Sequence, residues 1–242
     1  MTQGIEKWRQ VHMALNLLSF DPSFLKGIVL RIRLGPVHEK LSKEIKQLAG
    51  KATKLHPNMS DEQLYGGIDV VSTIKSEGLK KTTGLLNRGG WFILGMAERC
   101  TSEMAARLSQ ALDLNQISPL VIIDEGIDDE AAPEALSDRL AFSFDLSDLS
   151  ISDTQKKVPK LRFSPKKTDI VVDPENLESI VALAVQFGIE SLRAPQLALH
   201  VARIHALSEG RPKVNMKDIE FAALMVYPSR AKKYPEKPKE EE

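Results

Sequence analysis

Residues 27–48 have the order of elements that a nucleotide-binding enzyme uses to hold phosphate: a strand, a glycine-containing turn and an amphipathic helix. The working motif is G-x-x-x-x-G-K-[ST], in which the glycines admit the phosphates, the lysine neutralises them and the hydroxyl holds Mg²⁺. In this chain the two glycine positions are Ile32 and Val37. The lysine position is His38, and the hydroxyl position is Glu39.

Two further features of this turn work against phosphate binding. Gly35 is followed by Pro36, which has no backbone N–H to direct at a phosphate oxygen. A carboxylate at Glu39, about 5 Å from a phosphate oxygen, would cost roughly 3 kcal/mol per pair of unit charges at an effective dielectric constant near 20. We therefore expect no ATP binding of the usual kind here. The alternative is that the segment is only a strand–helix turn.

A second candidate is the acidic pair Asp124-Glu125, which directly follows the apolar run 120–123. Such a pair at the end of a strand binds Mg²⁺ and orients the attacking water in many ATPases. Strand ends also carry acids for solubility. A pair of acids that binds Mg²⁺ has little use in hydrolysis when no loop binds the phosphates. The pair is therefore the basis of an alternative hypothesis, an active ATPase.

Other patterns for metal binding are weaker. Asp148, Ser150 and Ser152 fit the D-x-S-x-S pattern of the metal site in integrin-type I domains. Only helices are expected after them, so we interpret them as a polar turn. The five histidines lack the spacing of metal ligands, and His200 and His205, five residues apart on one predicted helix, are expected to pack or to line an interface. We expect no metal site.

Apolar runs of two kinds alternate along the first 150 residues. Short runs rich in β-branched residues predict strands, and apolar residues every three or four positions predict helices. Strands are expected at 27–33, 91–94, 120–123 and 141–146, and helices at 6–19, 36–48, around 104–112 and at 133–140. This alternation is typical of an α/β fold with a largely parallel sheet covered by helices on both faces.

The pattern changes after residue 150. Residues 151–173 are polar and predict a connector. The lysines of this connector are Lys156, Lys157, Lys160, Lys166 and Lys167. Three helices are then expected, at 174–187, 192–209 and 216–227, the last with Asn215 and Asp218 as a capping box. We therefore predict an α/β domain at 1–150, a small helical domain at 174–230 and a disordered Lys-, Glu- and Pro-rich end at 231–242.

Composition excludes several classes of protein. The 242 residues contain 33 basic and 33 acidic side chains, and this balance argues against a dedicated nucleic-acid-binding protein. A single cysteine, Cys100, cannot form an intrachain disulfide. No apolar run approaches the roughly 20 residues that cross a bilayer, and residues 1–6 are unlike a secretion signal. We expect a cytoplasmic protein.

Several stretches of the chain resemble the magnesium-chelatase D subunit, in order and spacing, over nearly all of residues 5–230. They are GIVLRIRLGPVHEKL from Gly27, LYGGIDV from Leu64, GLLNRGGWFILGMAER from Gly84, IDEGIDDEAAPEALSDRLAFSFDL from Ile123 and IESLRAPQLALHVARIHALSEGR from Ile189. The resemblance implies an AAA+-like core with a helical lid. It also implies that the chain is the N-terminal module of that subunit, without its C-terminal integrin I domain.

The resemblance assigns roles to further residues. Gly95 and Met96 occupy the place of the Walker B acids, and Gly126 occupies the polar sensor-one position. Arg139 matches the arginine finger, which acts on the nucleotide of a neighbouring subunit, and Arg193 matches sensor two. The alternatives are that Arg139 pairs with its neighbour Asp138 or faces solvent, and that Arg193 forms a salt bridge between domains. A β-hairpin of the ATPase relative is missing before Ser118, so contacts made by such a hairpin are not expected.

The function implied by the resemblance is that of a non-hydrolysing subunit. The family's enzyme inserts Mg²⁺ into protoporphyrin IX in chlorophyll and bacteriochlorophyll synthesis and is driven by ATP. Its I subunit is the ATPase, its H subunit binds the porphyrin, and the D subunit assembles with both and with itself. We expect no cofactor on this chain, since ATP and Mg²⁺ serve the complex. The alternatives are an active ATPase using Asp124 and Glu125, or an AAA+-like adaptor on DNA helped by the lysines of 156–167.

Overall fold

A computed structural model describes residues 3–76, 78–155 and 170–233. Its centre is a five-stranded sheet in which every neighbouring pair is parallel. In spatial order the strands are β2 (Ala52–Leu55), β5 (Trp91–Leu94), β6 (Leu120–Asp124), β1 (Gly27–Arg31) and β7 (Phe142–Asp145). The predicted α/β fold with a largely parallel sheet is confirmed.

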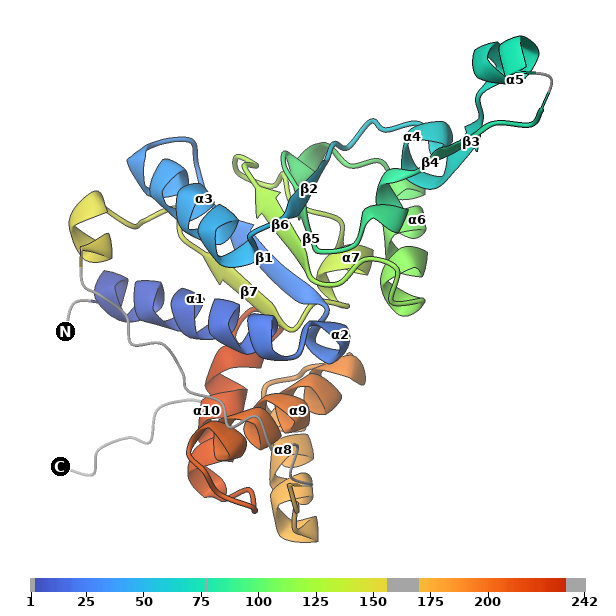
Figure 1. The fold of residues 1–242 in the computed structure, drawn as a ribbon. Coiled ribbons are helices and arrows are strands. Elements are labelled where there is room, and N and C mark those ends of the chain that lie inside the picture. The colour runs from blue at the N-terminus through green and yellow to red at the C-terminus, as the bar shows by residue number, and fades with distance from the viewer. Residues whose placement is uncertain (1–2, 77, 156–169, 234–242) are drawn as a thin grey trace, which may run out of the picture.

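Helices cover both faces of this sheet (Figure 1). One face carries α1 (Gln3–Phe20) and α3 (Pro36–Ala49), and the other carries α6 (Ser102–Asp113) and α7 (Glu134–Ser137). Successive side chains of a strand point to opposite faces, so β1 supplies both cores. Ile28 and Leu30 pack in the core that contains α1 and α3, and Val29 packs in the core that contains α6.

Because all five strands run the same way, their carboxyl ends meet at one edge of the sheet and their amino ends at the other. We call these the carboxyl edge and the amino edge. The carboxyl edge carries the turn before α3 and the loop after β6. The amino edge carries the turn before β1 and the residues between α7 and β7.

Residues 52–83 contain elements that the sequence did not predict. Strand β2 lies at the border of the sheet, and β3 (Gly66–Ile68) pairs with β4 (Lys81–Thr83) as a separate antiparallel hairpin. The short helix α4 (Asp61–Tyr65) precedes this hairpin, and α5 (Val70–Ser76) follows β3. The hairpin and α5 project away from the body of the molecule (Figure 1).

The last three helices form a separate layer below the sheet, as predicted (Figure 1). They are α8 (Pro174–Gln186), α9 (Arg193–Ser208) and α10 (Met216–Val226), and α10 begins with the predicted capping box of Asn215 and Asp218. Helix α9 contacts the short helix α2 (Pro22–Leu25), where the His200 ring stacks on Phe24 at 3.8 Å between centroids. Within the described residues, none of the helices has both the length and the apolar character needed to span a membrane. The connector lysines and residues 234–242 lie outside the described residues.

Candidate functional site

The turn before α3 is held by packing of its side chains. Ile32, at the first glycine position of the phosphate motif, is 2% exposed, and its backbone N–H donates to the carbonyl of Asp124 at 2.9 Å. Val37, at the second glycine position, is also buried in the core with α1. Gly35 precedes α3 without any side-chain cap, and Pro36 is the first residue of the helix. Apolar side chains therefore stand where a phosphate loop leaves room for phosphate.

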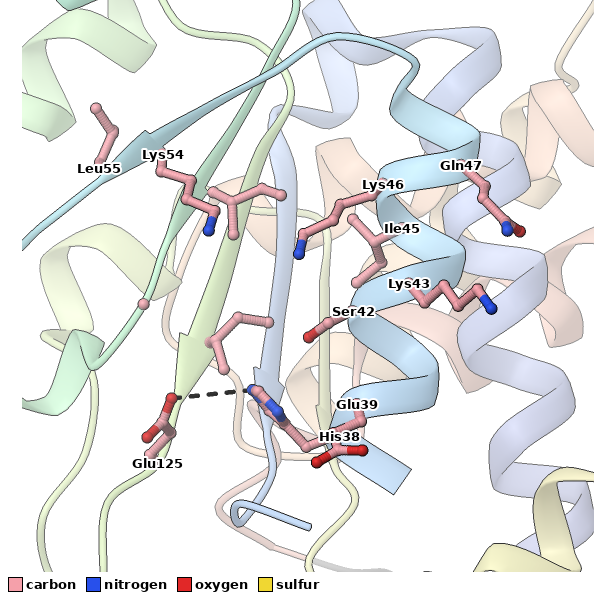
Figure 2. Close-up of a pocket in the computed structure, with 13 residues that line it drawn as sticks. His38, Glu39, Ser42, Lys43, Ile45, Lys46, Gln47, Lys54, Leu55 and Glu125 are labelled. Carbon is pink, nitrogen blue, oxygen red and sulfur yellow. Dashed lines mark ion pairs between the residues drawn. The ribbon is translucent and has the colours of Figure 1, made fainter. Parts of the chain in front are cut away.

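His38 occupies the lysine position and points toward Glu125 (Figure 2). Its Nε2 lies 3.9 Å from Oε1 of Glu125, which follows β6, and both side chains are about one-fifth exposed. Glu39 lines the same cavity as this pair. This end of the cavity therefore carries two carboxylates and one imidazole, a set of charges that disfavours a triphosphate.

The side chain of Asp124 is hydrogen-bonded to the loop that follows β6. Its carboxylate, 3% exposed, accepts hydrogen bonds from the backbone N–H of Gly126 at 2.9 Å and of Ala132 at 3.1 Å. Arg31 is its register partner on β1, with Nη1 3.7 Å from Oδ2 of Asp124. These hydrogen bonds use one acceptor site on each carboxylate oxygen, and the burial of Asp124 restricts the access of a metal ion to the remaining sites.

The side chain of Arg31 binds the backbone of the same loop. Its guanidinium donates to the carbonyl oxygens of Glu130 and Asp128, each at 2.9 Å, and of Gly126 at 3.2 Å. A Cβ on Gly126 would lie 2.4 Å from the Glu130 carbonyl oxygen, so the sensor-one position cannot accept a polar side chain unless the loop moves. Sequence reasoning did not single out Arg31, whose only signal was its position beside the candidate turn.

The Walker B position offers no ligand. Gly95 follows β5 directly, and Met96, in the left-handed region at φ 50°, opens a single 3₁₀ turn at Ala97–Arg99. The acidic residue of that turn, Glu98, accepts a hydrogen bond from the backbone N–H of Glu125 at 3.0 Å. Across the residues that the structure describes, no group of three or more His, Cys, Asp or Glu is arranged to hold a metal ion.

Asp148, Ser150 and Ser152 belong to a polar turn after β7. The Ser150 hydroxyl lies 2.7 Å from that of Ser152 and donates to the carboxylate of Asp153 at 2.7 Å. Ser150 also forms a capping box with Asp153 at the start of a 3₁₀ turn, Ile151–Thr154. These contacts agree with the interpretation of the segment as an exit turn.

The two candidate arginines lie at the amino edge. Arg139 donates from Nε to both carboxylate oxygens of Asp113 at 3.1 Å, and from Nη2 to one of them at 2.9 Å. These hydrogen bonds lower the pKa of Asp113 below its usual value. The partner of Arg139 is thus Asp113 rather than the neighbouring Asp138, which corrects the alternative considered for it. Sequence spacing could not reveal this pair, because Asp113 ends α6.

Arg193, the first residue of α9, forms an ion pair with Asp138, with Nη1 3.1 Å from Oδ2. Asp138 follows α7, so this pair joins the helical layer to the α/β layer. It is the contact considered as the alternative to a sensor role. Arg193 remains 48% exposed, whereas Arg139 is 20% exposed. Arg193 is therefore the less constrained of the two arginines.

The arginines and the turn before α3 lie at opposite edges of the sheet. Arg139 precedes β7, whereas Gly35 follows β1, and β1 and β7 are paired in parallel. Strands of four or five residues, at about 3.3 Å per residue, place these edges roughly 15 Å apart. Arg139 therefore cannot reach the turn before α3 of its own chain.

Comparison with known proteins identifies the fold. Residues 177–242 match the family model of the AAA lid domain. A putative ATPase from Cytophaga hutchinsonii superposes with a TM-score of 0.64 at 16% identity, over 95% of this chain and 86% of that one. An MCM homologue from Methanopyrus kandleri superposes with a TM-score of 0.55 at 15% identity, over 89% of this chain and 54% of that one. The protein therefore has an AAA+-like fold, as the sequence resemblance implied.

Sequence comparison is more specific. The chain is 39% identical to the magnesium-chelatase 60 kDa subunit of Rhodobacter capsulatus, over 90% of this chain and 40% of that protein. The identity is 35% with the 60 kDa subunit of Cereibacter sphaeroides and 21% with the 67 kDa subunit of Chlorobaculum parvum, which the chain covers to 41% and 43%. The chain is thus similar to magnesium-chelatase 60 kDa subunits over nearly all of its own length. It spans about two-fifths of the length of these relatives.

Proposed function

We propose that this chain is a non-hydrolysing AAA+-like module of a magnesium chelatase. It assembles with the ATPase I subunit, and the complex with the porphyrin-binding H subunit inserts Mg²⁺ into protoporphyrin IX. ATP is bound and hydrolysed on the I subunit, and this module transmits the resulting motion. The homology to magnesium-chelatase D subunits supports the assignment to this enzyme.

The observation that carries the non-hydrolysing role is the state of Asp124. An active site would need this carboxylate to face Mg²⁺, but it is buried and hydrogen-bonded to two backbone N–H groups. The neighbouring positions add nothing that holds a nucleotide: Gly95 and Met96 have no acid, and His38 faces Glu125 instead of a phosphate. The alternative hypothesis of an active ATPase using Asp124 and Glu125 is therefore disfavoured.

The position of Arg139 supports a role toward a neighbour. Since Arg139 lies at the amino edge, it is directed away from the turn before α3 and is available only to another subunit. In a ring, the amino edge of this module would face the nucleotide on an adjacent I subunit. Arg139 would first have to leave Asp113 and the carbonyl oxygen of Ala135, and Asp113 is the more exposed partner of the ion pair.

Hydrolysis by the isolated chain tests the main proposal. With ATP and Mg²⁺, phosphate release by the chain alone should equal the rate without protein. Turnover that rises with chain concentration and is lost in the Asp124→Asn variant would establish the rival ATPase hypothesis instead.

The role of Arg139 requires the mixed complex with an I subunit. Arginine fingers raise hydrolysis by about 10³-fold or more in related nucleotidases, so the contribution of this chain to ATP turnover should disappear in Arg139→Ala. Binding of the variant to the I subunit should persist. Arg203→Ala, which removes an exposed arginine from α9, is the matched control. Equal turnover by wild type and Arg139→Ala would refute the finger role and leave the assembly role standing.

A further inference from the structure

A cavity of about 660 Å³ runs along α3 on the face of the sheet that also carries α1. One end is the contact between His38 and Glu125, and the other lies beside β2. Its floor is apolar and consists of Ile45 of α3, Ile93 of β5 and Ile123 of β6. Eight of the side chains around the hollow are polar or charged, but most of the surface that they and the isoleucines present to it is apolar, and a hollow of this size can hold a small molecule.

Two lysines define the end of the cavity beside β2. Lys46 of α3 and Lys54 of β2 extend toward one another from opposite walls (Figure 2). Lys54 is the register partner of Ile93, so the ammonium group and the apolar floor lie on the same face of the sheet. Within the part of the chain that the structure describes, neither ammonium group has a hydrogen bond or an ion pair.

The charges of the cavity are separated along its length. The two lining carboxylates, Glu39 and Glu125, lie at the opposite end from Lys46 and Lys54 (Figure 2). Two ammonium groups that share one space repel each other, and an anion between them removes this repulsion and makes charge-assisted hydrogen bonds with both. The cavity thus has one anion-attracting end, an apolar middle and one anion-repelling end.

We propose that this cavity binds a flat, apolar molecule that carries an anionic group on one edge. The ring system lies on the floor of isoleucines, and the anion lies between Lys46 and Lys54. The carboxylates at the far end fix this orientation, because the reverse one would place anion against anion. The inference stands on the cavity alone and does not depend on the proposed function.

Two kinds of molecule have this chemistry. One is a tetrapyrrole with carboxylates on one edge, and the other is a purine nucleotide whose phosphate lies at the lysines rather than at the start of α3. Protoporphyrin IX and AMP are suitable probes, and AMP is used without Mg²⁺ because the lysine end offers no metal ligand. Fluorescence quenching measures the first and calorimetry the second, each on the full chain at low and at high salt.

The decisive comparison is between two sets of charge reversals. The double variant Lys46→Glu, Lys54→Glu should weaken binding of the accepted probe about 100-fold, since two charge-assisted contacts of about 1.4 kcal/mol or more are lost. Lys217→Glu should change it by less than about threefold, because Lys217 is exposed on α10 and is not among the residues that line the cavity. Lys54→Gln alone should give an intermediate loss and serves if the double variant does not fold.

The identity of the probe that binds distinguishes the two sources. Saturable binding of either probe that is lost in the double variant, and retained in Lys217→Glu, supports the site. Failure of both probes to bind at concentrations up to about 1 mM would overturn the proposal. So would binding that the double variant leaves unchanged, or that all charge reversals weaken equally.

Discussion

Replacement of Asp124 by asparagine separates the two explanations of the acidic pair at the carboxyl edge. Asp124 accepts hydrogen bonds from the N–H groups of Gly126 and Ala132 with different oxygens. In Asp124→Asn only one of these oxygens remains, and the amide NH₂ that replaces the other faces a backbone donor. One buried N–H is left unpaired, at about 1–3 kcal/mol. Loss of the ion pair with the partly exposed Arg31 adds at most about 1 kcal/mol.

The expected destabilisation is therefore about 1–4 kcal/mol, which corresponds to a fall of roughly 2–16 °C in the melting temperature of a chain of this size. Urea unfolding followed by circular dichroism gives the free energy, and a thermal scan gives the melting temperature. Glu125→Gln is the matched control. Its carboxylate is partly exposed and, among the described residues, pairs only with His38 at 3.9 Å, so the substitution should change stability by less than about 1 kcal/mol.

Unchanged stability of Asp124→Asn would contradict the structural role of Asp124. If Asp124→Asn unfolds like the wild type while a measurable affinity for MgATP disappears, then Asp124 is a metal ligand and not a structural acid. The assignment of this chain as a non-hydrolysing module would then be wrong. Destabilisation without any MgATP binding in either protein is the outcome that the geometry predicts.

Two further predictions concern the helical layer. Asp218 is fully buried and takes two hydrogen bonds of 2.6 Å from Arg211, so Asp218→Asn should destabilise the chain by about 2–4 kcal/mol, whereas the exposed Glu190→Gln should have little effect. Burial opposes ionisation of Asp218, but hydrogen bonds led by those of Arg211 outweigh it and lower its pKa. The difference between wild type and Asp218→Asn should therefore be full above about pH 4 and vanish as the pH falls further, in urea unfolding across that range. Arg193→Ala, which removes the ion pair with Asp138, should cost at most about 1 kcal/mol but speed amide exchange at the start of α9.

Helices and strands with a clear pattern of apolar residues could be predicted from the sequence, and those without such a pattern could not. The runs that became β5 and β6 are continuous apolar stretches, and their bounds agree with the structure to within one residue. Strand β2 has the sequence ATKL, and its strand character depends on its pairing with β5, far away in the chain. Gly66 and Gly84 permit the backbones of the projecting hairpin to approach closely, since a Cβ at either would lie 2.2 Å from a backbone atom.

The candidate site could likewise be predicted only in part. The sequence predicts which side chains occupy the motif positions, and Pro36, His38 and Glu39 are where the motif placed them. It does not predict what those side chains contact. Asp124 forms an ion pair with Arg31 on a different strand and hydrogen bonds with a loop. Arg31 also binds the backbone of that loop. Such pairings depend on the register of β1 and β6, which no local pattern reveals.

The two edges of the sheet differ in what they retain, and this difference carries the functional argument. At the carboxyl edge, His38 and Glu39 occupy the lysine and hydroxyl positions of the phosphate motif, and the carboxylate of Asp124 holds a loop. The amino edge retains Arg139 and Arg193, each paired with an acid that is partly exposed to solvent. Each ion pair joins two elements of this chain, so a structural role alone accounts for both arginines, and only the finger role predicts that Arg139→Ala lowers ATP turnover in the mixed complex. The proposal that this chain acts only on a neighbour's nucleotide is therefore decided by that measurement.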